Sequence, residues 1–508
     1  MQAFPDPAPK PLDHLALAGA RGAPALVDRA GVLDHAGLDR AVGVLAAALL
    51  SRGLRPGDRV ASWLPKQRLA CLMPLAAARA GLVHVPVNPQ LKHGQVAYIL
   101  ADSGARLLIA GRGRADTLGA DDRPVACALM IEEDEGAALL ADGEPLPPST
   151  IDTDALAAIL YTSGSTGRPK GVMLSHANLW LGAVGVAHYL GLGPDDRTLA
   201  LLPLSFDYGQ NQLLSTWAAG GCVYPLDYLT ARDVVRAVGR HAITTLAGVP
   251  PLWIQLAEAD WPAESIAPLR RLTNTGGRMS VPLVRQLRAL FPDARLFSMY
   301  GLTEAFRSTY LDPALIDQHP DSIGRAIPFA EVLVVTPDGR IAADGEPGEL
   351  VHAGPLVAQG YWRDAERSAQ RFRPAPPASR YGGMAVWSGD TVVRDEDGLL
   401  RFVGRDDEMI KSSGNRISPT EIEEAAIASG AAVEAVAIGI PDDRLGQAIL
   451  LYARPAVEDA GAYLADWFRR NLPGFMQPAR VIWLDALPRN ANGKLDRAAL
   501  RAEAAKEA

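Results

Sequence analysis

Short apolar runs alternate with longer amphipathic stretches through the first half of the chain. Residues 38–51 keep their apolar side chains on one helical face and end before Gly53, and residues 59–64 follow as an apolar strand. Residues 70–80 and 83–87 repeat this order of helix and strand. Strands that alternate with helices through short connections pack as a parallel sheet with helices on both faces. The pattern therefore predicts an α/β fold.

A second round of the same alternation is expected downstream. It predicts helices at 177–190, 211–219 and 233–240 and strands at 198–204, 222–224, 244–248, 271–274 and 295–300. The acidic and proline-rich segment 123–150, which lies between the two rounds, is interpreted as a solvated surface excursion.

The last third of the chain changes character. β-like runs separated by Asp-Gly and Pro-Gly turns predict a small β subdomain at 331–336, 348–352 and 399–403. A compact unit of helices and strands follows a charged turn at 405–411, which we expect to be exposed, as domain boundaries are. We therefore expect a large N-terminal domain (1–406), made of parallel sheets covered by helices with the small β subdomain, and a small mobile α/β C-terminal domain (407–508).

Composition narrows the class of protein. The chain has 508 residues, of which 48% are hydrophobic and 21% charged, and its formal net charge is −8. This is typical of a globular protein with more than one domain, and the negative charge argues against nucleic-acid binding. Cys71, Cys127 and Cys222 lack metal or disulfide spacing, so buried free thiols are expected. With no signal-peptide pattern and no apolar run of the roughly 18 residues that a bilayer requires, we expect a cytoplasmic protein without a membrane span.

A loop rich in glycine and hydroxyl side chains joins two apolar runs that are predicted to form a hairpin. The residues at its tip that can hold phosphate are Thr162, Ser163, Gly164, Ser165, Thr166, Gly167 and Lys170. Glycine lets backbone N–H groups approach a phosphate closely, hydroxyls add donors and lysine adds charge. Composition alone is also compatible with a flexible linker, and the loop lacks the Walker spacing.

Three further motifs combine glycine with polar side chains. Thr303 and Glu304 follow a predicted strand and pair a hydroxyl with a carboxylate, which suits phosphate and a hard cation. Gly276 and Gly277 would let a flat base lie against bare backbone. Asp390 could accept two hydrogen bonds from a ribose diol. Each motif alone is equally typical of an ordinary turn.

Together these segments resemble the adenylate-forming ligases, which include acyl-CoA synthetases, amino-acid adenylation domains and luciferases, over residues 10–500. The resemblance implies an enzyme that uses ATP and Mg²⁺ to join a carboxylic acid to AMP. The positions that it assigns to the nucleotide are Tyr300 at the adenine, Asp390 and Arg405 at the ribose, Thr303 and Lys170 at the phosphates, and Glu304 at the metal.

The C-terminal positions of the same resemblance imply a swinging domain. Asp407 would be the hinge, Gly414 and Arg416 would lie in a loop that enters for a thiol step, and Lys494 would be the catalytic lysine of adenylation. A lysine on such a turn is otherwise simply solvated. Because Lys494 and the Gly414 loop belong to one domain, rotation about Asp407 would separate two half-reactions. The implied acceptor is a phosphopantetheine thiol, either of coenzyme A or of a carrier protein.

The resemblance also assigns an acid-binding pocket. Its residues here are Phe206, Asp207, Asn211, Thr273, Thr275, Met299, Arg307 and Ser308. The Phe-Asp pair is typical of amino-acid adenylation domains, where the aspartate binds the substrate ammonium, whereas Gly209 is typical of acyl-CoA synthetases. Beside a fatty chain, a polar lining would leave groups unsatisfied at roughly 1 to 3 kcal/mol each. We therefore expect a small polar acid, an amino acid rather than a fatty acid.

Several alternatives stay open from the sequence. Asp207 and Arg307 could pair with each other instead of binding substrate. The enzyme could be an acyl-CoA synthetase for a fatty or aryl acid, or a luciferase-like oxygenase, which would share every motif. A non-catalytic nucleotide-binding module would be expected to lack Lys494 or Glu304, and both are present. Residues 306–310 also resemble the ligases found beside exosortase systems.

Overall fold

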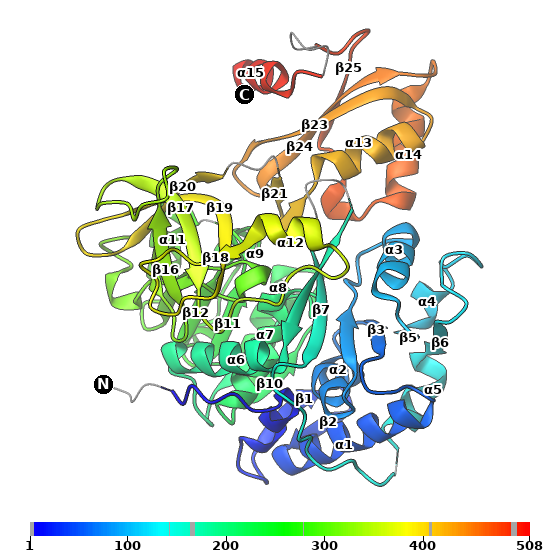
Figure 1. Cartoon of the computed structure of the whole chain (residues 1–508), viewed down its shortest axis with the longest axis vertical. Helices are drawn as coiled ribbons and strands as arrows, with labels where there is room; N and C mark the ends of the chain where they lie inside the picture. The colour runs from blue at the N-terminus through cyan, green and yellow to red at the C-terminus, as the bar shows by residue number, and fades with distance from the viewer. Residues whose placement is uncertain are drawn as a thin grey trace.

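The structure is a computed structural model, which describes residues 5–141, 143–162, 168–277, 279–405, 409–488 and 495–507. It is a mixed α/β fold with a large N-terminal domain of mostly parallel sheet and a small C-terminal domain (Figure 1), which confirms the expected fold class. The exact boundary stays a prediction, because residues 406–408 lie outside the described residues. No described helix is both long and apolar enough to cross a membrane. The three cysteines are buried free thiols, as expected.

One sheet of the N-terminal domain carries the predicted phosphate hairpin. Its order in the described residues is β6 (Ala128–Ile131), β5 (Leu107–Ala110), β3 (Arg59–Trp63), β4 (Val83–Pro86), β7 (Leu156–Thr162) and β8 (Lys170–Ser175). Neighbouring strands are parallel except β7 and β8, which form the predicted antiparallel hairpin with Thr162 opposite Lys170. Lys170 is therefore fixed at the first position of a strand.

The second sheet carries the other motifs. Its parallel part is β1 (Pro24–Asp28), β10 (Cys222–Pro225), β9 (Arg197–Ala200), β11 (Thr245–Gly248), β12 (Arg271–Asn274) and β13 (Arg295–Tyr300), with β2 (Gly31–Asp34) antiparallel at the edge. The predicted β subdomain continues it through β14 (Thr309–Tyr310), β15 (Ser322–Ala326), β20 (Leu400–Arg405), β19 (Met384–Arg394), β17 (Pro347–Ala353) and β16 (Glu331–Val335), and β18 (Phe372–Pro374) pairs with β19. Because β9, β11, β12 and β13 are parallel, the turns that follow them share one edge, where open α/β sheets bind ligands.

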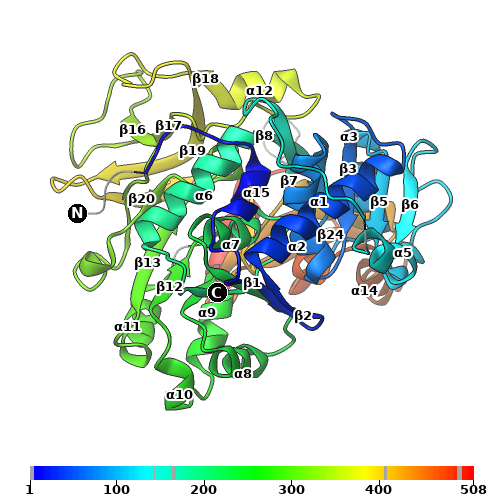
Figure 2. The ribbon, with the colours of Figure 1, turned by 90° about the horizontal axis from the view of Figure 1, so that it is seen from below.

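Helices α1, α2, α6 and α7 pack between the two sheets and share one apolar core with both (Figure 2). The helices of the N-terminal domain are α1 (His35–Ser51), α2 (Arg68–Arg79), α3 (His93–Ser103), α4 (Arg112–Ala115), α5 (Glu132–Leu139), α6 (His176–Leu190), α7 (Asp207–Ala218), α8 (Ala231–His241), α9 (Pro250–Ala257), α10 (Ala263–Ile266), α11 (Val281–Leu290) and α12 (Ala365–Arg371), with short 3-10 helices η1 (Leu12–Leu17), η2 (Thr303–Ala305) and η3 (Pro313–Leu315). Helix α7 begins at Asp207 rather than at the predicted residue 211. Asp207 thus lies in a first helical turn, where the helix dipole favours an acidic side chain.

The interpretation of segment 123–150 as a solvated excursion was wrong in part. The segment contains β6, which pairs with β5, and helix α5. Met130 and Leu139 are buried in the main core. The acidic run 132–135 occupies the first turn of α5. Acidic side chains are favourable at that helical position, so the same run that suggested solvated loop also favours a helix start.

The C-terminal domain is built on a separate sheet. Its described strands are β22 (Asn415–Ile417), β21 (Ile410–Ser412), β24 (Gly446–Pro455) and β23 (Ala432–Asp442), and β25 (Arg480–Trp483) pairs with β24. Helices α13 (Pro419–Ala428) and α14 (Ala460–Asn471) and the short η4 (Gly474–Met476) cover one face, and α15 (Arg497–Glu507) packs on the other. Figure 1 shows β21 next to the N-terminal domain and α15 at the far end of the C-terminal domain.

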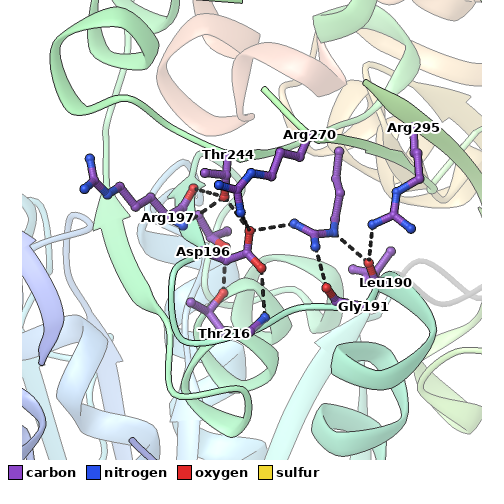
Figure 3. A network of polar contacts seen from close by, with 11 residues as sticks. Leu190, Gly191, Asp196, Arg197, Thr216, Thr244, Arg270 and Arg295 are labelled. Carbon is purple, nitrogen blue, oxygen red and sulfur yellow. Dashed lines mark hydrogen bonds and ion pairs between the residues drawn. The ribbon is translucent and has the colours of Figure 1, made fainter. Parts of the chain in front are cut away.

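A buried ionic network ties the amino ends of the central strands to α6 (Figure 3). Asp196, just before β9, accepts hydrogen bonds from Arg271 Nη1 at 2.6 Å and from Thr244 Oγ1 at 2.7 Å. Arg271 Nε in turn donates to the carbonyl of Leu190 at 2.6 Å. Asp196 and Arg271 are only 3% and 5% exposed. The pair is buried but satisfied, and it fixes the strands at the end opposite to the motif-bearing turns.

Candidate functional site

The phosphate hairpin and the turn after β13 meet through a buried ion pair. Lys170 Nζ lies 2.7 Å from Glu304 Oε1. The Tyr361 hydroxyl donates to the same carboxylate oxygen at 2.7 Å and lies 2.6 Å from Lys170 Nζ. The side chain of Glu304 is 2% exposed, and that of Lys170 is 10% exposed. The structure therefore brings together two residues that the sequence placed in separate motifs.

Several cations keep Glu304 ionised. Burial alone would raise the pKa of this carboxyl, but the charges of Lys170, Arg371 and Arg416 together hold its pKa well below the ordinary value. Burial lowers the pKa of Lys170, so the neighbouring carboxylate is what keeps the ammonium charged. The result is a cationic pocket around one carboxylate, as a polyphosphate would require.

Tyr361 and Arg371 were not predicted from the sequence. Tyr361 lies in a loop that bonds back to the hairpin, where Trp362 N donates to the Gly171 carbonyl at 2.7 Å. Arg371 is the last residue of α12, and it donates to the Trp387 carbonyl at 2.8 Å. Neither belongs to a recognisable motif of its own, and only the packing of the β subdomain against the hairpin brings them to Glu304.

Asp207 lies near this ion pair, close enough to Glu304 for its charge to act on Asp207. Its Oδ1 accepts a hydrogen bond from Thr303 Oγ1 at 3.1 Å, and the side chain is 8% exposed. Burial raises the pKa of Asp207, and the charge of Arg307 and the Thr303 hydroxyl oppose that rise only in part. Among the described residues, no ion pair joins Asp207 to Arg307. The alternative that these two side chains simply pair is therefore not what the structure contains.

The inner part of the pocket is a small cavity beneath α7. It is lined by four predicted residues, Asn211, Thr273, Met299 and Arg307, together with Tyr208 and Thr245 among others. The Tyr208 hydroxyl donates to the Thr273 carbonyl at 2.7 Å, which anchors the helix to β12. Tyr208 is thus a pocket residue that the sequence reasoning missed, although its neighbour Asp207 was named.

Three other predicted pocket residues lie outside this cavity. Phe206 lies near Gly276, with its Cζ 3.9 Å from the position of a Cβ there. Thr275 is buried in the turn after β12. Ser308 Oγ is hydrogen-bonded to His352 Nδ1 at 2.9 Å, and burial lowers the pKa of His352 to about 3, so the ring is neutral. Ser308 is therefore engaged by the β subdomain rather than facing the cavity.

The predicted nucleotide residues gather at the next part of the edge. The Tyr300 hydroxyl donates to Asp390 Oδ2, which joins the end of β13 to β19. Asp390 and Arg405 are backbone partners across β19 and β20. Gly276 has a φ of +78°, a conformation that glycine adopts without strain, and Gly277 follows it at the open edge. The four segments that carry these residues converge as the sequence predicted.

The loop after β21 reaches this site from the C-terminal domain. A Cβ on Gly414 would lie 3.0 Å from Val249 Cγ2, and the Gly414 carbonyl lies 3.8 Å from the Cβ position of Gly276. Gly414 also has a φ of +77°, so a side chain there would be both strained and crowded. Arg416 follows in β22, near enough to Glu304 to lower its pKa. The C-terminal domain thus presents this loop to Val249 and to the turn after β12.

Some predicted residues lie outside the described part of the chain. They are Ser163, Gly164, Ser165, Thr166, Gly167, Asp407 and Lys494, and the side chain of Arg405 is likewise not described. Their roles stay predictions. Thr162, the last described residue before the loop, has a buried Oγ1 without a hydrogen-bond partner, which leaves its hydroxyl available to a ligand.

Comparison with protein families decides the class of enzyme. Residues 14–362 match the model of the AMP-binding enzymes, and residues 421–494 match the model of the AMP-binding enzyme C-terminal domain. The chain belongs to this family of adenylate-forming ligases. Members form acyl-adenylates and thioesters, so the chain belongs to a family of enzymes rather than to a class of non-catalytic binding modules.

Curated relatives of this ligase differ in the acid named. Feruloyl-CoA synthase from Amycolatopsis sp is 33% identical over 473 residues, which cover 91% of this chain and 92% of that protein. An L-proline--[L-prolyl-carrier protein] ligase from Streptomyces coelicolor is 33% identical over 483 residues, which cover 90% and 89%. The two are equally similar to this ligase, so identity alone does not choose the substrate.

The domain arrangement of this ligase resembles one of two solved structures of a single enzyme more than it resembles the other. They are o-succinylbenzoate CoA synthetase (MenE) from Bacillus subtilis, 25% identical to this chain, and each covers 97% of this chain and 98% of its own. The structure bound with the product analogue OSB-NCoA superposes with a TM-score of 0.85. The complex with the acyl-adenylate intermediate OSB-AMP gives 0.71. The overall arrangement of this ligase is therefore closer to that of the product-analogue complex.

Proposed function

We propose that this ligase activates a small amino acid with ATP and then transfers the acyl group to a phosphopantetheine thiol. In the first step, a carboxylate oxygen of the acid forms a bond to the α-phosphorus of ATP. The bond between that phosphorus and the oxygen that bridges it to the β-phosphorus breaks, and pyrophosphate leaves with the bridging oxygen. No side chain is required as a nucleophile. The protein must instead hold both substrates and balance the charge on the phosphoryl oxygens.

One contact carries this proposal: the hydrogen bond from Thr303 to Asp207. Thr303 immediately precedes Glu304 in the same turn. Glu304 faces the cationic pocket, and Thr303 faces Asp207 in the proposed acid pocket. Asp207 is a buried carboxylate whose described partners include no cation. An unpaired buried carboxylate costs several kcal/mol, by an order-of-magnitude estimate, and a substrate ammonium would remove that cost. The acid would then lie beside the phosphates of ATP.

The metal site fits a cation that enters with the nucleotide. Glu304 supplies one carboxylate and Thr303 one hydroxyl, and the described residues contain no cluster of three or more His, Cys, Asp or Glu side chains able to hold a metal ion. Mg²⁺ is commonly held by one or two carboxylates plus substrate phosphate oxygens. Glu304 and Thr303 would hold Mg²⁺ in this way, and the metal would supply charge neutralisation at the phosphates. Lys170 would then be released toward the phosphates.

The second step would use the arrangement seen here. The thiol sulfur bonds to the acyl carbon, the bond from that carbon to the AMP oxygen breaks, AMP leaves and the thiol proton is lost. This assignment is supported by the Gly414 loop against Val249 and by the better superposition on the product-analogue complex. In the adenylation step, we expect Lys494 to approach the phosphates instead, and its substitution by alanine to lower the rate by about 10²-fold or more.

The test is ATP–pyrophosphate exchange over a panel of amino acids, fatty acids and aryl acids. Exchange that depends on a free amino group is expected. Exchange confined to fatty or aryl acids would reject the ammonium role of Asp207. Mass spectrometry of apo- and phosphopantetheinylated carrier protein, beside free coenzyme A, then identifies the acceptor.

A second candidate is an acyl-CoA synthetase for an aryl acid. The similarity to feruloyl-CoA synthase favours it. Against it stands the polar lining of the inner cavity, in which Asn211 Oδ1 and Thr245 Oγ1 are buried without hydrogen-bond partners. An aryl ring would leave both unsatisfied, at about 1 to 3 kcal/mol each.

A further inference from the structure

Arg307 carries a buried guanidinium that forms no ion pair with any described acidic group, and the charge of Asp207 acts on it only from beyond ion-pair distance. The residue is 1% exposed, and its Nε has no hydrogen-bond partner. Its closest described interaction is with the ring of Tyr208, whose centroid lies 4.8 Å from the guanidinium carbon. A ring face attracts a cation, but this attraction offsets only part of the penalty of burying a charge. Burying this guanidinium without a counter-ion therefore lowers the stability of the ligand-free protein, and a ligand anion would remove that cost.

The backbone holds this side chain in place. Phe306 has a φ of +60°, which is strained for a residue with a side chain. Its ring is packed so closely against α6 that a Cβ on Gly182 would lie 2.4 Å from it, and a Cβ on Gly301 would lie 3.0 Å from Arg307 Cα. Two glycines therefore make room for a strained turn. Strain that packing maintains in this way is typical of functional sites.

The surroundings of Arg307 suit a small anion. It lines the inner cavity of about 20 Å³ with Asn211 and Thr245, and Thr245 Oγ1 is a hydroxyl donor without a partner. A cavity of this size holds about one water molecule, so only a short group can enter without moving the walls. A guanidinium and a hydroxyl together recognise a carboxylate through charge-assisted hydrogen bonds. The lining thus favours a short acidic group over a long acyl chain.

We propose that Arg307 binds a second anionic group of the acid, so that the substrate is an acidic amino acid. This inference rests on the proposed function. The substrate ammonium would neutralise Asp207, the distal carboxylate would neutralise Arg307, and the remaining carboxylate would react with ATP. An amino acid with a neutral side chain would leave Arg307 buried and unpaired in the complex. Arg307 is then the residue that determines specificity.

The experiment compares ligand pairs that differ only in the distal group: glutamate with glutamine, and aspartate with asparagine. In ATP–pyrophosphate exchange, the acidic member of at least one pair should have a kcat/KM about 100-fold higher, since breaking a buried charge pair costs roughly 2 to 5 kcal/mol. Equal rates, or a preference for the amide, would overturn the Arg307 subsite while leaving the proposed function intact. Preference for a dicarboxylic acid without an amino group would keep the subsite and reject the ammonium role of Asp207.

Calorimetric titration of the same pairs of acids into the full chain measures their binding affinities without catalysis. Tighter binding of the acidic member supports the inference even if exchange with every acid fails, a result that would refute the proposed function alone. Equal binding overturns the inference.

A variant provides the second arm. In Arg307→Met the preference for the acidic member should fall to about onefold, whereas Arg295→Met, at an exposed arginine outside the pocket, should keep it. A preference that persists in folded Arg307→Met would contradict the assignment. If the variant does not fold, the wild-type ligand pairs still decide.

Discussion

Asp207→Asn should separate substrate binding from protein stability. The change removes one charge, keeps the shape of the side chain, and still lets Thr303 donate its hydrogen bond, which is 3.1 Å long in the native protein. Loss of a buried carboxylate partner costs an ammonium about 2 to 5 kcal/mol. In ATP–pyrophosphate exchange, kcat/KM for the preferred amino acid should therefore fall by roughly 30-fold to several thousand-fold.

Stability should move in the opposite direction. Because burial raises the pKa of Asp207, the ionised side chain destabilises the ligand-free protein once the pH rises above the ordinary range of an aspartate. The neutral asparagine side chain of the variant would carry no such penalty. The melting temperature of the ligand-free variant at neutral pH should therefore be no lower than that of the native protein, and any gain should shrink as the solution is acidified.

Asp196→Asn is the matched control. Asp196 is also a buried aspartate, but Arg271 and Thr244 hydrogen-bond to it (Figure 3). Loss of its charge would leave Arg271 buried and unpaired, at about 3 to 5 kcal/mol of stability. We expect a lower melting temperature with an unchanged KM for the acid, the reverse of Asp207→Asn. Exchange kinetics that are unaffected by Asp207→Asn, or a melting temperature that falls as far as in Asp196→Asn, would refute this reasoning.

Three further variants test the contacts between segments. Glu304→Gln should lower the free energy of unfolding by about 3 to 5 kcal/mol, because Lys170 loses its counter-ion. Urea unfolding of the two single variants and of the double variant Glu304→Gln/Lys170→Met should give a clear coupling energy. Simple additivity of the two single effects would contradict the buried ion pair. Gly414→Ala, with its Cβ 3.0 Å from a neighbouring side chain, should slow thioester formation in single-turnover assays more than pyrophosphate exchange, and equal effects on both would count against the loop assignment. Burial against α3, where Gln95 lies 3.5 Å away, raises the pKa of Glu421 to about 7. The docked arrangement should therefore weaken as the pH rises from the ordinary range of a glutamate to about 7, and Glu421→Gln should remove that fall in the pH profile of thioester formation. A fall that persists in the variant would exclude Glu421 as its source.

Local sequence signals predicted the elements and the motif turns well. β12 and β13 were predicted with the bounds that the structure has, because an apolar run between breakers defines a buried strand almost completely. The parallel order of these strands then brings the turns after them to one edge. The convergence of Gly276, Tyr300 and Glu304 therefore follows from topology that the alternation of helices and strands already implies.

Contacts between distant segments could not be predicted in the same way. Tyr361 reaches Lys170 and Glu304 only because the β subdomain folds back on the hairpin. The sequence also could not decide whether Asp207 and Arg307 pair. The resemblance assigned both to an acid pocket, but in the structure Asp207 lies in the first turn of α7 and Arg307 follows a strained turn, and the two charged groups form no ion pair.

Some buried charges of this protein are paired and others are not, and the unpaired ones can contribute free energy to ligand binding. At the amino ends of its strands the protein satisfies Asp196 with Arg271, so the same sheet accommodates a buried ion pair. At the carboxyl ends it keeps Asp207 and Arg307 apart, and neither has an opposite charge among the described residues within ion-pair distance. Burying these two charges without counter-ions lowers the stability of the ligand-free protein. A ligand that supplies both counter-ions removes this cost, and the free energy recovered strengthens its binding. An acid that supplies only one counter-ion would recover only part of that free energy, so selection among acids follows from charge before shape.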